Sequence, residues 1–245
     1  MPITMNILPA KTVSLTTDLH THCLPGMDDG AADIATSLAM LATAKEQGIT
    51  TIAATPHFYP GQESVAAFLE RRQESFGALS ARLPADAPRL LCGAEVLLRE
   101  GISRLNLREL CLNGTELLLV EFPFRPAPYW LSEELENIVF GQGLTPIFAH
   151  VDRYMSWYSR EQMARLAGMG HAILQLNGEA FLDRRHFAAL RRWLPKGHAL
   201  VMGSDMHNME RRSPNLGEAC RVMNGHRVGR EWLQNAEQTT ARWLP

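Results

Sequence analysis

Cysteine is scarce in this chain, and no two cysteines lie close together. The four stand at positions 23, 92, 111 and 220 of 245 residues, and no C-x-x-C motif occurs. This spacing favours neither a zinc knuckle nor a disulfide framework. We therefore expect the four thiols to be small buried apolar groups.

A long hydrophobic run and an excess of charge of one sign are also absent. No segment approaches the ~18 consecutive apolar residues of a membrane span, and residues 1–17 lack the basic start and dense apolar segment of a signal peptide. The 24 basic and 26 acidic side chains give a formal charge of −2. The sequence thus predicts a cytoplasmic protein without a membrane span, and its charge does not encode binding to nucleic acid.

Apolar residues, by contrast, are plentiful and regularly arranged. They make up 46% of the chain against 20% charged residues, which is enough for a sizeable core. Seven apolar runs alternate with helical patterns, and the expected strands cover residues 12–19, 50–54, 89–98, 116–122, 145–149, 171–177 and 199–204. This alternation is typical of a parallel α/β fold, and closing the sheet gives a (β/α) barrel. We expect a leader and the start of the first strand in residues 1–17, and one barrel domain over residues 18–245.

The first strand runs into two histidines and then into a turn rich in carboxylates. His20 and His22 are two positions apart, so on an extended backbone both imidazoles project to the same side. Asp28, Asp29 and Gly30 follow as a loop whose glycine permits a tight turn. One of the two carboxylates is therefore expected to turn back toward the histidines.

Further residues of the kind that bind metals recur where the other apolar runs end. Together with the first segment they form a set of nine: His20, His22, Asp29, His57, Glu95, Glu121, His150, Asp205 and His207. Because the carboxyl ends of parallel strands share one face of a barrel, we expect these side chains to meet there. Imidazole and carboxylate ligands without thiolate suit Mn²⁺, Fe or Zn²⁺. Nine ligands exceed the need of one ion, so we expect two or three ions that share a bridging carboxylate. Adjacent ions of this kind activate a bridging water and clamp a phosphoryl group, which indicates phosphoester hydrolysis.

The motifs around these residues resemble those of the PHP superfamily, named for polymerase and histidinol phosphatase. Within it, they are most similar to the metal-dependent tyrosine phosphatases of capsular polysaccharide synthesis, of the CpsB/YwqE type. The resemblance runs from about residue 18 to about residue 212, and the motifs that carry it are DLHTHCLPGMDDG (18–30), GITTIAATPH (48–57), GAE (93–95), LVEFP (119–123), AHVDRY (149–154), QLN (175–177) and GSDMHN (203–208).

The resemblance implies a distorted (β/α)7 barrel of the PHP type, with two or three divalent ions, Mn²⁺ foremost, at the carboxyl ends of the strands. It implies one ion held by His20, His22, Glu95 and Asp205, a second held by Glu95, Glu121 and His150, and a third held by Asp29, His57 and His207. Arg153 and Arg212 match arginines that hold the phosphate. The implied reaction is hydrolysis of phosphotyrosine by a metal-bridging hydroxide, and the implied partner is the tail of a bacterial tyrosine kinase that regulates exopolysaccharide synthesis.

Some positions depart from the family pattern, and alternatives stay open. Val151 and Asp152 replace a Pro-Glu pair, and Phe58 stands where a second histidine is common. Arg153 could instead pair with its neighbour Asp152. A phosphoesterase of the histidinol phosphatase type and a non-catalytic metal-binding domain are the alternative functions, whereas a nuclease is disfavoured because no basic track is present. No cysteine has an arginine six residues later, as the loop of thiol-dependent phosphatases requires.

Overall fold

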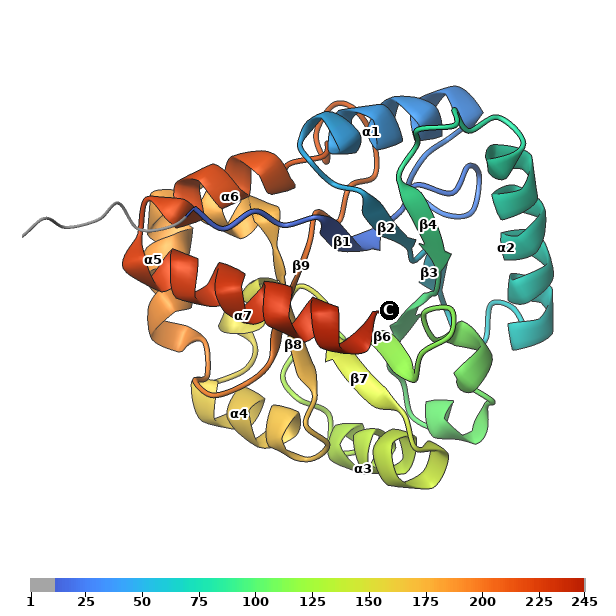
Figure 1. The fold of residues 1–245 in the computed structure, drawn as a ribbon. Coiled ribbons are helices and arrows are strands. Elements are labelled where there is room, and N and C mark those ends of the chain that lie inside the picture. Colours follow the sequence, from blue (N-terminus) through green and yellow to red (C-terminus); the bar gives the residue numbers. More distant parts are fainter. Residues whose placement is uncertain (1–11, 245) are drawn as a thin grey trace, which may run out of the picture.

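The computed structural model describes residues 12–244 as an α/β fold with two parallel sheets, which confirms the predicted class. Figure 1 shows the strands gathered at the centre with the helices around them. The strands are β1 (Thr17–Thr21), β2 (Thr51–Ala54), β3 (His57–Phe58), β4 (Arg89–Cys92), β5 (Glu95–Leu97), β6 (Leu117–Glu121), β7 (Thr145–Phe148), β8 (Ile173–Asn177) and β9 (Leu200–Gly203). The part of the predicted leader in residues 1–11 lies outside the described residues.

One expected strand is interrupted by two residues, and another is followed after two residues by a short strand that was not predicted, β3. β2 and β3 are separated by Thr55 and Pro56, and β4 and β5 by Gly93 and Ala94. The prediction of one continuous strand over residues 89–98 was therefore wrong. The break divides the strands into a sheet of order β1-β2-β4 and a sheet of order β3-β5-β6-β7-β8-β9. Proline at position 56 has no N–H to donate to a ladder, which accounts for the interruption in the first of these pairs.

The two ends of this arrangement approach each other without forming a continuous ladder. A single isolated bridge joins Thr21 to Met206, just past the end of β9. Two backbone hydrogen bonds support it, from Asp205 N to His20 O (2.8 Å) and from His22 N to Met206 O (2.9 Å). The loop that follows β9 is thereby fixed beside the histidines of β1.

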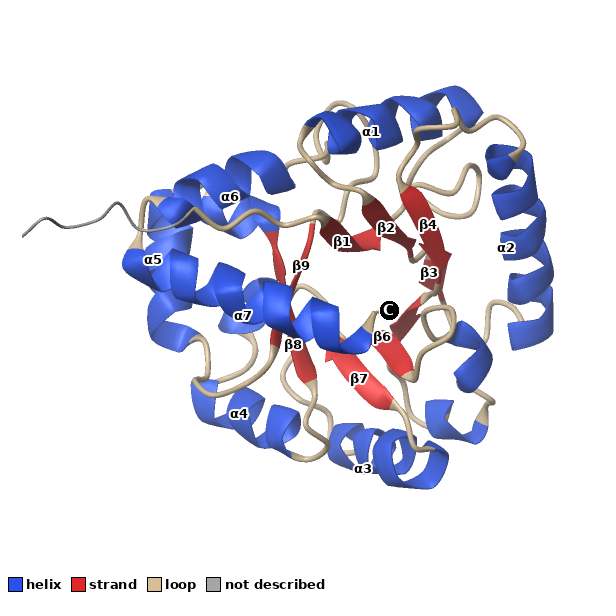
Figure 2. Ribbon diagram, in the orientation of Figure 1, coloured by secondary structure: helices blue, strands red, loops and turns tan. Residues whose placement is uncertain are grey.

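Helices cover the outside of the strands (Figure 2). They are α1 (Ile34–Glu46), α2 (Val65–Ser80), α3 (Leu131–Glu136), α4 (Arg160–Gly168), α5 (Arg184–Trp193), α6 (Leu216–Asn224) and α7 (Arg227–Trp243). Asp33, Ser64, Ser159 and Asp183 cap four of them, each accepting a hydrogen bond from a backbone N–H of the first turn. None of the described helices is long and apolar enough to cross a membrane.

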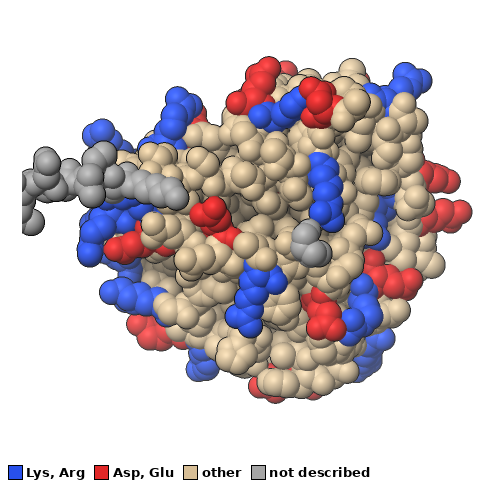
Figure 3. Space-filling view, viewed as in Figure 1, with Lys and Arg blue, Asp and Glu red and all other residues tan. Residues whose placement is uncertain are grey.

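The last helix, α7, crosses the amino ends of the strands. Asn235 of α7 accepts a hydrogen bond from Leu200 N (2.7 Å) at the start of β9. Trp243 and Leu244 pack against an apolar cluster of the strands, which includes Leu117 and Ile147. Figure 3 views this face, where Lys, Arg, Asp and Glu are interspersed. The amino ends of the strands are therefore covered by apolar packing, with a cavity of about 260 Å³ between α7 and the starts of β1, β2 and β4.

The prediction for the cysteines was correct for two of them only. Cys23 and Cys111 are buried, whereas Cys92 and Cys220 are partly exposed. Burial raises the pKa of the Cys23 thiol to about 12, so this group stays protonated at neutral pH.

Candidate metal centre

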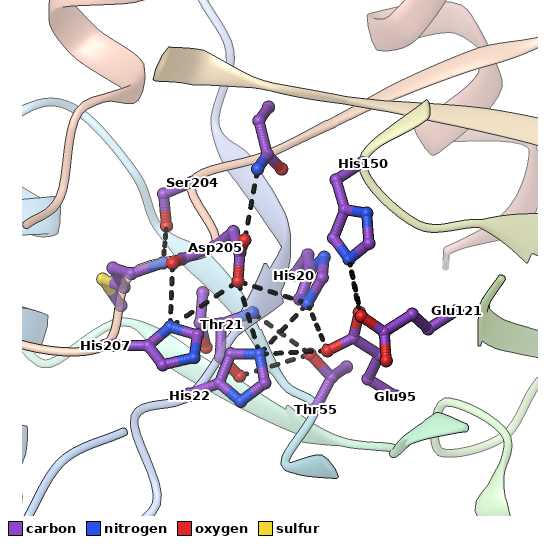
Figure 4. Close-up of polar contacts among 12 residues, drawn as sticks. His20, Thr21, His22, Thr55, Glu95, Glu121, His150, Ser204, Asp205 and His207 are labelled. Carbon is purple, nitrogen blue, oxygen red and sulfur yellow. Dashed lines mark hydrogen bonds and ion pairs between the residues drawn. The ribbon is translucent and has the colours of Figure 1, made fainter. Parts of the chain in front are cut away.

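The structure brings the nine predicted ligand residues together at the carboxyl ends of the strands. Figure 4 shows the side chains of His20, His22, Glu95, Glu121, His150, Asp205 and His207 converging there. All seven are at most 8% exposed. The other two, Asp29 and His57, lie within ion-pair distance of members of this set. Seven of the nine form three overlapping groups of potential ligand atoms, each compact enough to surround one cation. His150 and Asp205 lie beside these groups, within ion-pair distance of their members.

The first group contains His20, His22 and Glu95. The Nε2 atoms of the two histidines lie 3.1 Å apart, and they lie 3.1 Å and 3.3 Å from Oε2 of Glu95. Oδ1 of Asp205 is 3.5 Å and 3.4 Å from the same two nitrogens. Four predicted ligands of one ion therefore point at a common centre.

The second group contains His57, Glu95 and Glu121. Nε2 of His150 lies 2.8 Å from Oε1 of Glu95 and 3.5 Å from Oε1 of Glu121. Nδ1 of His57 lies 3.0 Å from Oε2 of Glu95. Oε2 of Glu95 thus faces His20, His22 and His57, whereas Oε1 faces His150, so Glu95 lies between the first two groups. The family resemblance had assigned His57 to the third ion only.

The third group contains His22, Asp29, His57 and His207. Oδ1 of Asp29 lies 3.3 Å from Nε2 of His207 and 3.6 Å from Nε2 of His57. The Asp29 side chain is 66% exposed, in contrast to the other carboxylates of the site. This third group therefore forms the solvent-facing side of the centre.

Neighbouring polar groups fix which nitrogen of each histidine faces the centre. Nδ1 of His20 lies 3.0 Å from Oε1 of Gln175, and Nδ1 of His22 lies 2.7 Å from Oδ2 of Asp28. Both partners are acceptors, so each Nδ1–H donates to its partner and each Nε2 faces the centre, where it can present a lone pair to a bound cation. Two lone pairs and two carboxylates around one point are an arrangement that a cation stabilises.

Two residues of the centre have backbone conformations that L-residues rarely adopt. His150 follows β7 with φ 30°, and Asp205 follows β9 with φ 54°. Such left-handed conformations cost on the order of 1–3 kcal/mol and occur preferentially at functional sites. Gly203 precedes Asp205, and a Cβ there would lie 2.6 Å from Cβ of His20. The end of β9 is thus shaped to approach the histidines closely.

The carboxylates and imidazoles of the centre shift one another's pKa values. Burial alone would raise the pKa of Glu95 and of Asp205, but the charge of His20 and hydrogen bonds to nearby histidines outweigh it and hold both pKa values well below their ordinary range. Burial opposes the charge of His150, yet Glu121 and Glu95 raise its pKa to about 9. Burial and the charge of His22 lower the pKa of His207 to about 4. The carboxylates are ionised and need positive charge beside them.

Several buried atoms of the centre have no hydrogen-bond partner among the described residues. They are His57 Nδ1, Glu95 Oε2, His150 Nδ1, Asp205 Oδ1 and His207 Nε2. Buried polar atoms are almost always paired, so five exceptions in one place call for a missing partner. Four of these five atoms face other ligand-type atoms at 3.0–3.6 Å. The donor set, the unpaired atoms and the acceptor-rich geometry all fit divalent cations.

Both predicted arginines contact the centre through Asp205. Nη2 of Arg153 and Nη2 of Arg212 lie 2.7 Å and 2.6 Å from Oδ2 of Asp205. Asn177 donates a third hydrogen bond to this oxygen at 3.2 Å. Oδ2 is therefore held by three donors while Oδ1 faces His20 and His22. The alternative pairing of Arg153 with Asp152 does not occur within 4.0 Å among the described residues.

Sequence reasoning missed the role of the residues that position the ligands. Gln175 contacts Nδ1 of His20 and accepts from His150 N at 2.6 Å. Asp28, and not only Asp29, turns back toward the histidines and also accepts from His57 N at 2.8 Å. Burial opposes ionisation of Asp28, but the hydrogen bond and charge of His22 lower its pKa below the usual range. The available signals were the Asp28-Asp29 pair and the polar Gln175 inside an apolar strand.

Comparison with known proteins identifies the family of this chain. A family model described as "Capsular polysaccharide synthesis, CpsB/CapC" matches residues 16–240. The chain belongs to the CpsB/CapC family. Tyrosine-protein phosphatase YwqE of Bacillus subtilis is 33% identical over 215 residues, covering 84% of this chain and 83% of YwqE. Tyrosine-protein phosphatase CpsB of Streptococcus agalactiae is 26% identical over 235 residues, covering 90% of this chain and 96% of CpsB.

A solved structure of the CpsB/CapC family agrees with the fold described above. It comes from a study of YwqE from Bacillus subtilis and CpsB from Streptococcus pneumoniae, described there as unique metal-dependent tyrosine phosphatases. It superimposes with a TM-score of 0.70 at 25% identity, covering 92% of this chain and 94% of that one. The resemblance to this PHP-type family that the motifs indicated is thereby confirmed.

Proposed function

We propose that this protein is a metal-dependent protein-tyrosine phosphatase. The single observation that carries the proposal is the convergence of nine ligand-type side chains on one centre, where four buried atoms without a hydrogen-bond partner among the described residues face other ligand-type atoms. Membership of the CpsB/CapC family supports it, because the relatives named above are tyrosine-protein phosphatases.

Two or three divalent ions fit the three groups of ligand atoms, and we propose Mn²⁺ as the ion. One would be held by His20, His22, Glu95 and Asp205, a second by Glu95, Glu121 and His150, and a third by Asp29, His57 and His207. His57 reaches two groups, and the third assignment uses its Nε2, which faces Asp29. When bound, such ions supply Lewis-acid charge and lower the pKa of a coordinated water.

Arg153 and Arg212 are the residues of this chain that we assign to phosphate binding. Their side chains are 31% and 30% exposed, so each guanidinium has free donors on the open side of the centre. Both are anchored to one oxygen of Asp205, which fixes their orientation. A phosphate monoester carries about two negative charges near neutral pH and suits the planar donor fork of arginine.

The aromatic side chains at the rim suit an aryl substrate. Phe124 is 45% exposed, and its ring stacks on His150 with centroids 5.7 Å apart. Tyr59 stacks on His57 at 4.9 Å. A phenyl ring that enters the site beside these side chains would make offset-stacked contacts. Tyrosinate, with a solution pKa of ~10, is also a better leaving group than an alkoxide.

We also propose that the nine strand segments act as the seven strands of a distorted barrel in one domain. The pairs β2/β3 and β4/β5 each follow one another after two residues, and the Thr21–Met206 bridge joins the ends. The substrate we propose is a phosphotyrosine-bearing protein of capsule or exopolysaccharide synthesis, the tail of a bacterial tyrosine kinase. We place the reaction in the cytoplasm, as the sequence predicts.

The test is a comparison of substrates with purified protein that contains Mn²⁺. A phosphotyrosine peptide, the matched phosphoserine peptide and histidinol phosphate are hydrolysed separately, and kcat/KM is measured for each. We expect the phosphotyrosine peptide to be the best substrate. Equal rates on phosphoserine would replace the proposal by a general phosphoesterase, and metal binding without turnover on any substrate would favour an interaction domain.

A further inference from the structure

A polar cavity that the proposed reaction does not use lies among the segments that follow β5 and β6. It has a volume of about 580 Å³ and is lined by Arg99, Glu100, Gly101, Arg104, Arg125 and Trp130. The three arginines are exposed, whereas Trp130 is only 6% exposed. We call this set of six residues the basic pocket.

The arginines of the basic pocket are not neutralised by carboxylates. Within residues 12–244, none of the three forms an ion pair within 4.0 Å, in contrast to Arg71, Arg108, Arg153 and Arg212. Arg99 donates to the carbonyl oxygen of Pro60 at 2.5 Å, a neutral partner. Three guanidinium groups and one carboxylate, that of Glu100, therefore line one cavity with an excess of positive charge, and such an array attracts anions.

The two nearby carboxylates accept hydrogen bonds from neutral donors, and their charges offset only part of the charge of the three arginines. Glu100 lines the cavity, but its Oε1 accepts a hydrogen bond from the Tyr129 hydroxyl at 2.8 Å. Glu134 accepts from Gly101 N at 2.5 Å and from Ser103 N at 2.9 Å. These bonds hold the loop that carries Arg104 against the start of α3. The position of this loop is therefore fixed by hydrogen bonds. The three arginines outnumber the carboxylates, so the pocket keeps more positive than negative charge.

The basic pocket lies at the same edge of the sheet as the metal centre. Arg99 comes four residues after Glu95, and Arg125 comes four residues after Glu121. Four residues span at most ~14 Å, so both arginines begin within that distance of a predicted ligand. Phe124, whose ring stacks on His150, directly precedes Arg125. The exposed Phe124 side chain thus contacts a residue of the centre and is the immediate sequence neighbour of a residue of the pocket.

We infer that the basic pocket binds a second anionic side chain of the substrate peptide, three to five residues from the phosphotyrosine that is hydrolysed. This inference rests on the proposed tyrosine phosphatase activity and adds a specificity site to it. An extended peptide rises about 3.3 Å per residue, so three to five residues cover the distance. The anion is a carboxylate of Asp or Glu, or the phosphate of a second phosphotyrosine, and both suit guanidinium donors.

The test uses three peptides of equal length with one central phosphotyrosine. One has only neutral flanking residues, one has Glu at the third to fifth positions on both sides, and one has a non-hydrolysable phosphotyrosine analogue there. We expect kcat/KM to be about tenfold higher for at least one anionic peptide than for the neutral one, the effect of one charge-assisted contact. The advantage should shrink at high ionic strength. An advantage for both identifies a general anion pocket, and one for the analogue alone identifies a phosphate pocket.

Two variants assign the effect to the pocket. The measured quantity is the ratio of kcat/KM for the anionic peptide to kcat/KM for the neutral peptide. Arg104→Gln and Arg125→Gln should each lower this ratio at least threefold, and the double variant should bring it close to one. The value of kcat/KM for the neutral peptide should stay unchanged in all three variants. Arg165→Gln is the matched control, because Arg165 is an exposed arginine in the last turn of α4. Binding of peptides whose central residue is also non-hydrolysable, measured by fluorescence anisotropy, should show the same ratios in Kd.

The outcomes separate this inference from the function on which it rests. If wild-type protein hydrolyses all three peptides equally, or if both pocket variants keep the wild-type advantage, the inference is wrong and the phosphatase proposal stands. If Mn²⁺-loaded wild-type protein hydrolyses none of the peptides, the proposed function itself fails.

Discussion

The amino and carboxyl ends of the strands are built on opposite principles. At the amino end, Trp243 and Leu244 pack against an apolar cluster. At the carboxyl end, five buried polar atoms lack a hydrogen-bond partner among residues 12–244, and two residues, His150 and Asp205, adopt left-handed conformations. Packing at the amino end stabilises the fold, whereas the left-handed residues and unpaired atoms at the carboxyl end lower its stability and form a functional site. The comparison shows where substitutions should affect stability and where they should affect chemistry.

The largest effect is expected from Glu95 at the carboxyl end. Its two oxygens face different groups of ligand atoms. Glu95→Gln removes the shared charge, so hydrolysis of phosphotyrosine should fall by about 10³-fold or more and metal content by elemental analysis should fall with it. Asp205→Ala and His207→Ala should act in the same way while the thermal unfolding midpoint stays within a few degrees. A Glu95→Gln protein with wild-type rate and metal content would contradict the assignment.

The arginines should have a smaller effect that leaves the metals in place. Arg153→Ala and Arg212→Ala should each lower kcat/KM for phosphotyrosine by about 10- to 10³-fold, because each removes a charge-assisted contact to the phosphate. Metal occupancy should stay at the wild-type level, since Asp205 keeps its other arginine and Asn177. Lysine at either position should restore only part of the rate, because an ammonium lacks the planar fork. Wild-type kinetics in both alanine variants would refute this role.

Asp28 offers a weaker test, because it acts through His22. Asp28→Ala should reduce metal affinity about 10- to 100-fold, as loss of such an outer partner typically does. Asp28→Asn should be milder, because its amide oxygen can still accept from Nδ1 of His22. Titration of metal-free protein with Mn²⁺ measures the effect directly. Equal affinity in the alanine variant and the wild type would show that Asp28 does not position the ligand.

The amino end should respond in stability alone. Trp243→Ala removes apolar contacts at the amino end and should lower the free energy of unfolding by about 1–3 kcal/mol. This loss is smaller than the loss expected for a fully buried tryptophan. The value of kcat/KM should stay unchanged. Phe140→Ala is the matched control, because Phe140 is 73% exposed and should change stability by less than about 0.5 kcal/mol. Chemical denaturation with a parallel activity assay compares the two. A Trp243→Ala protein with wild-type stability and reduced activity would contradict the claim that the amino end contributes to stability alone.

The sequence was sufficient for the order of the elements and for the location of the site. Apolar runs separated by helical patterns are local signals, and most predicted ligands lie at or just after the end of such a run, as Glu121 ends β6 and His150 comes two residues after β7. The positioning contacts could not be predicted, because they join distant parts of the chain. Gln175 and His20 are 155 residues apart, and nothing local to either one indicates the other. The interruption after β4 likewise depends on packing, since a Cβ at Gly93 would lie 2.6 Å from the Leu112 side chain.

The most direct test of the metal-dependent site is the hydrolysis of a phosphotyrosine peptide before and after metal removal. The protein is stripped with a chelator, its metal content is checked by elemental analysis, and Mn²⁺ is then added back to the same sample. We predict that the metal-free protein is inactive and that Mn²⁺ restores hydrolysis, while iodoacetamide has little effect. Full activity in protein shown to contain no metal would contradict the account.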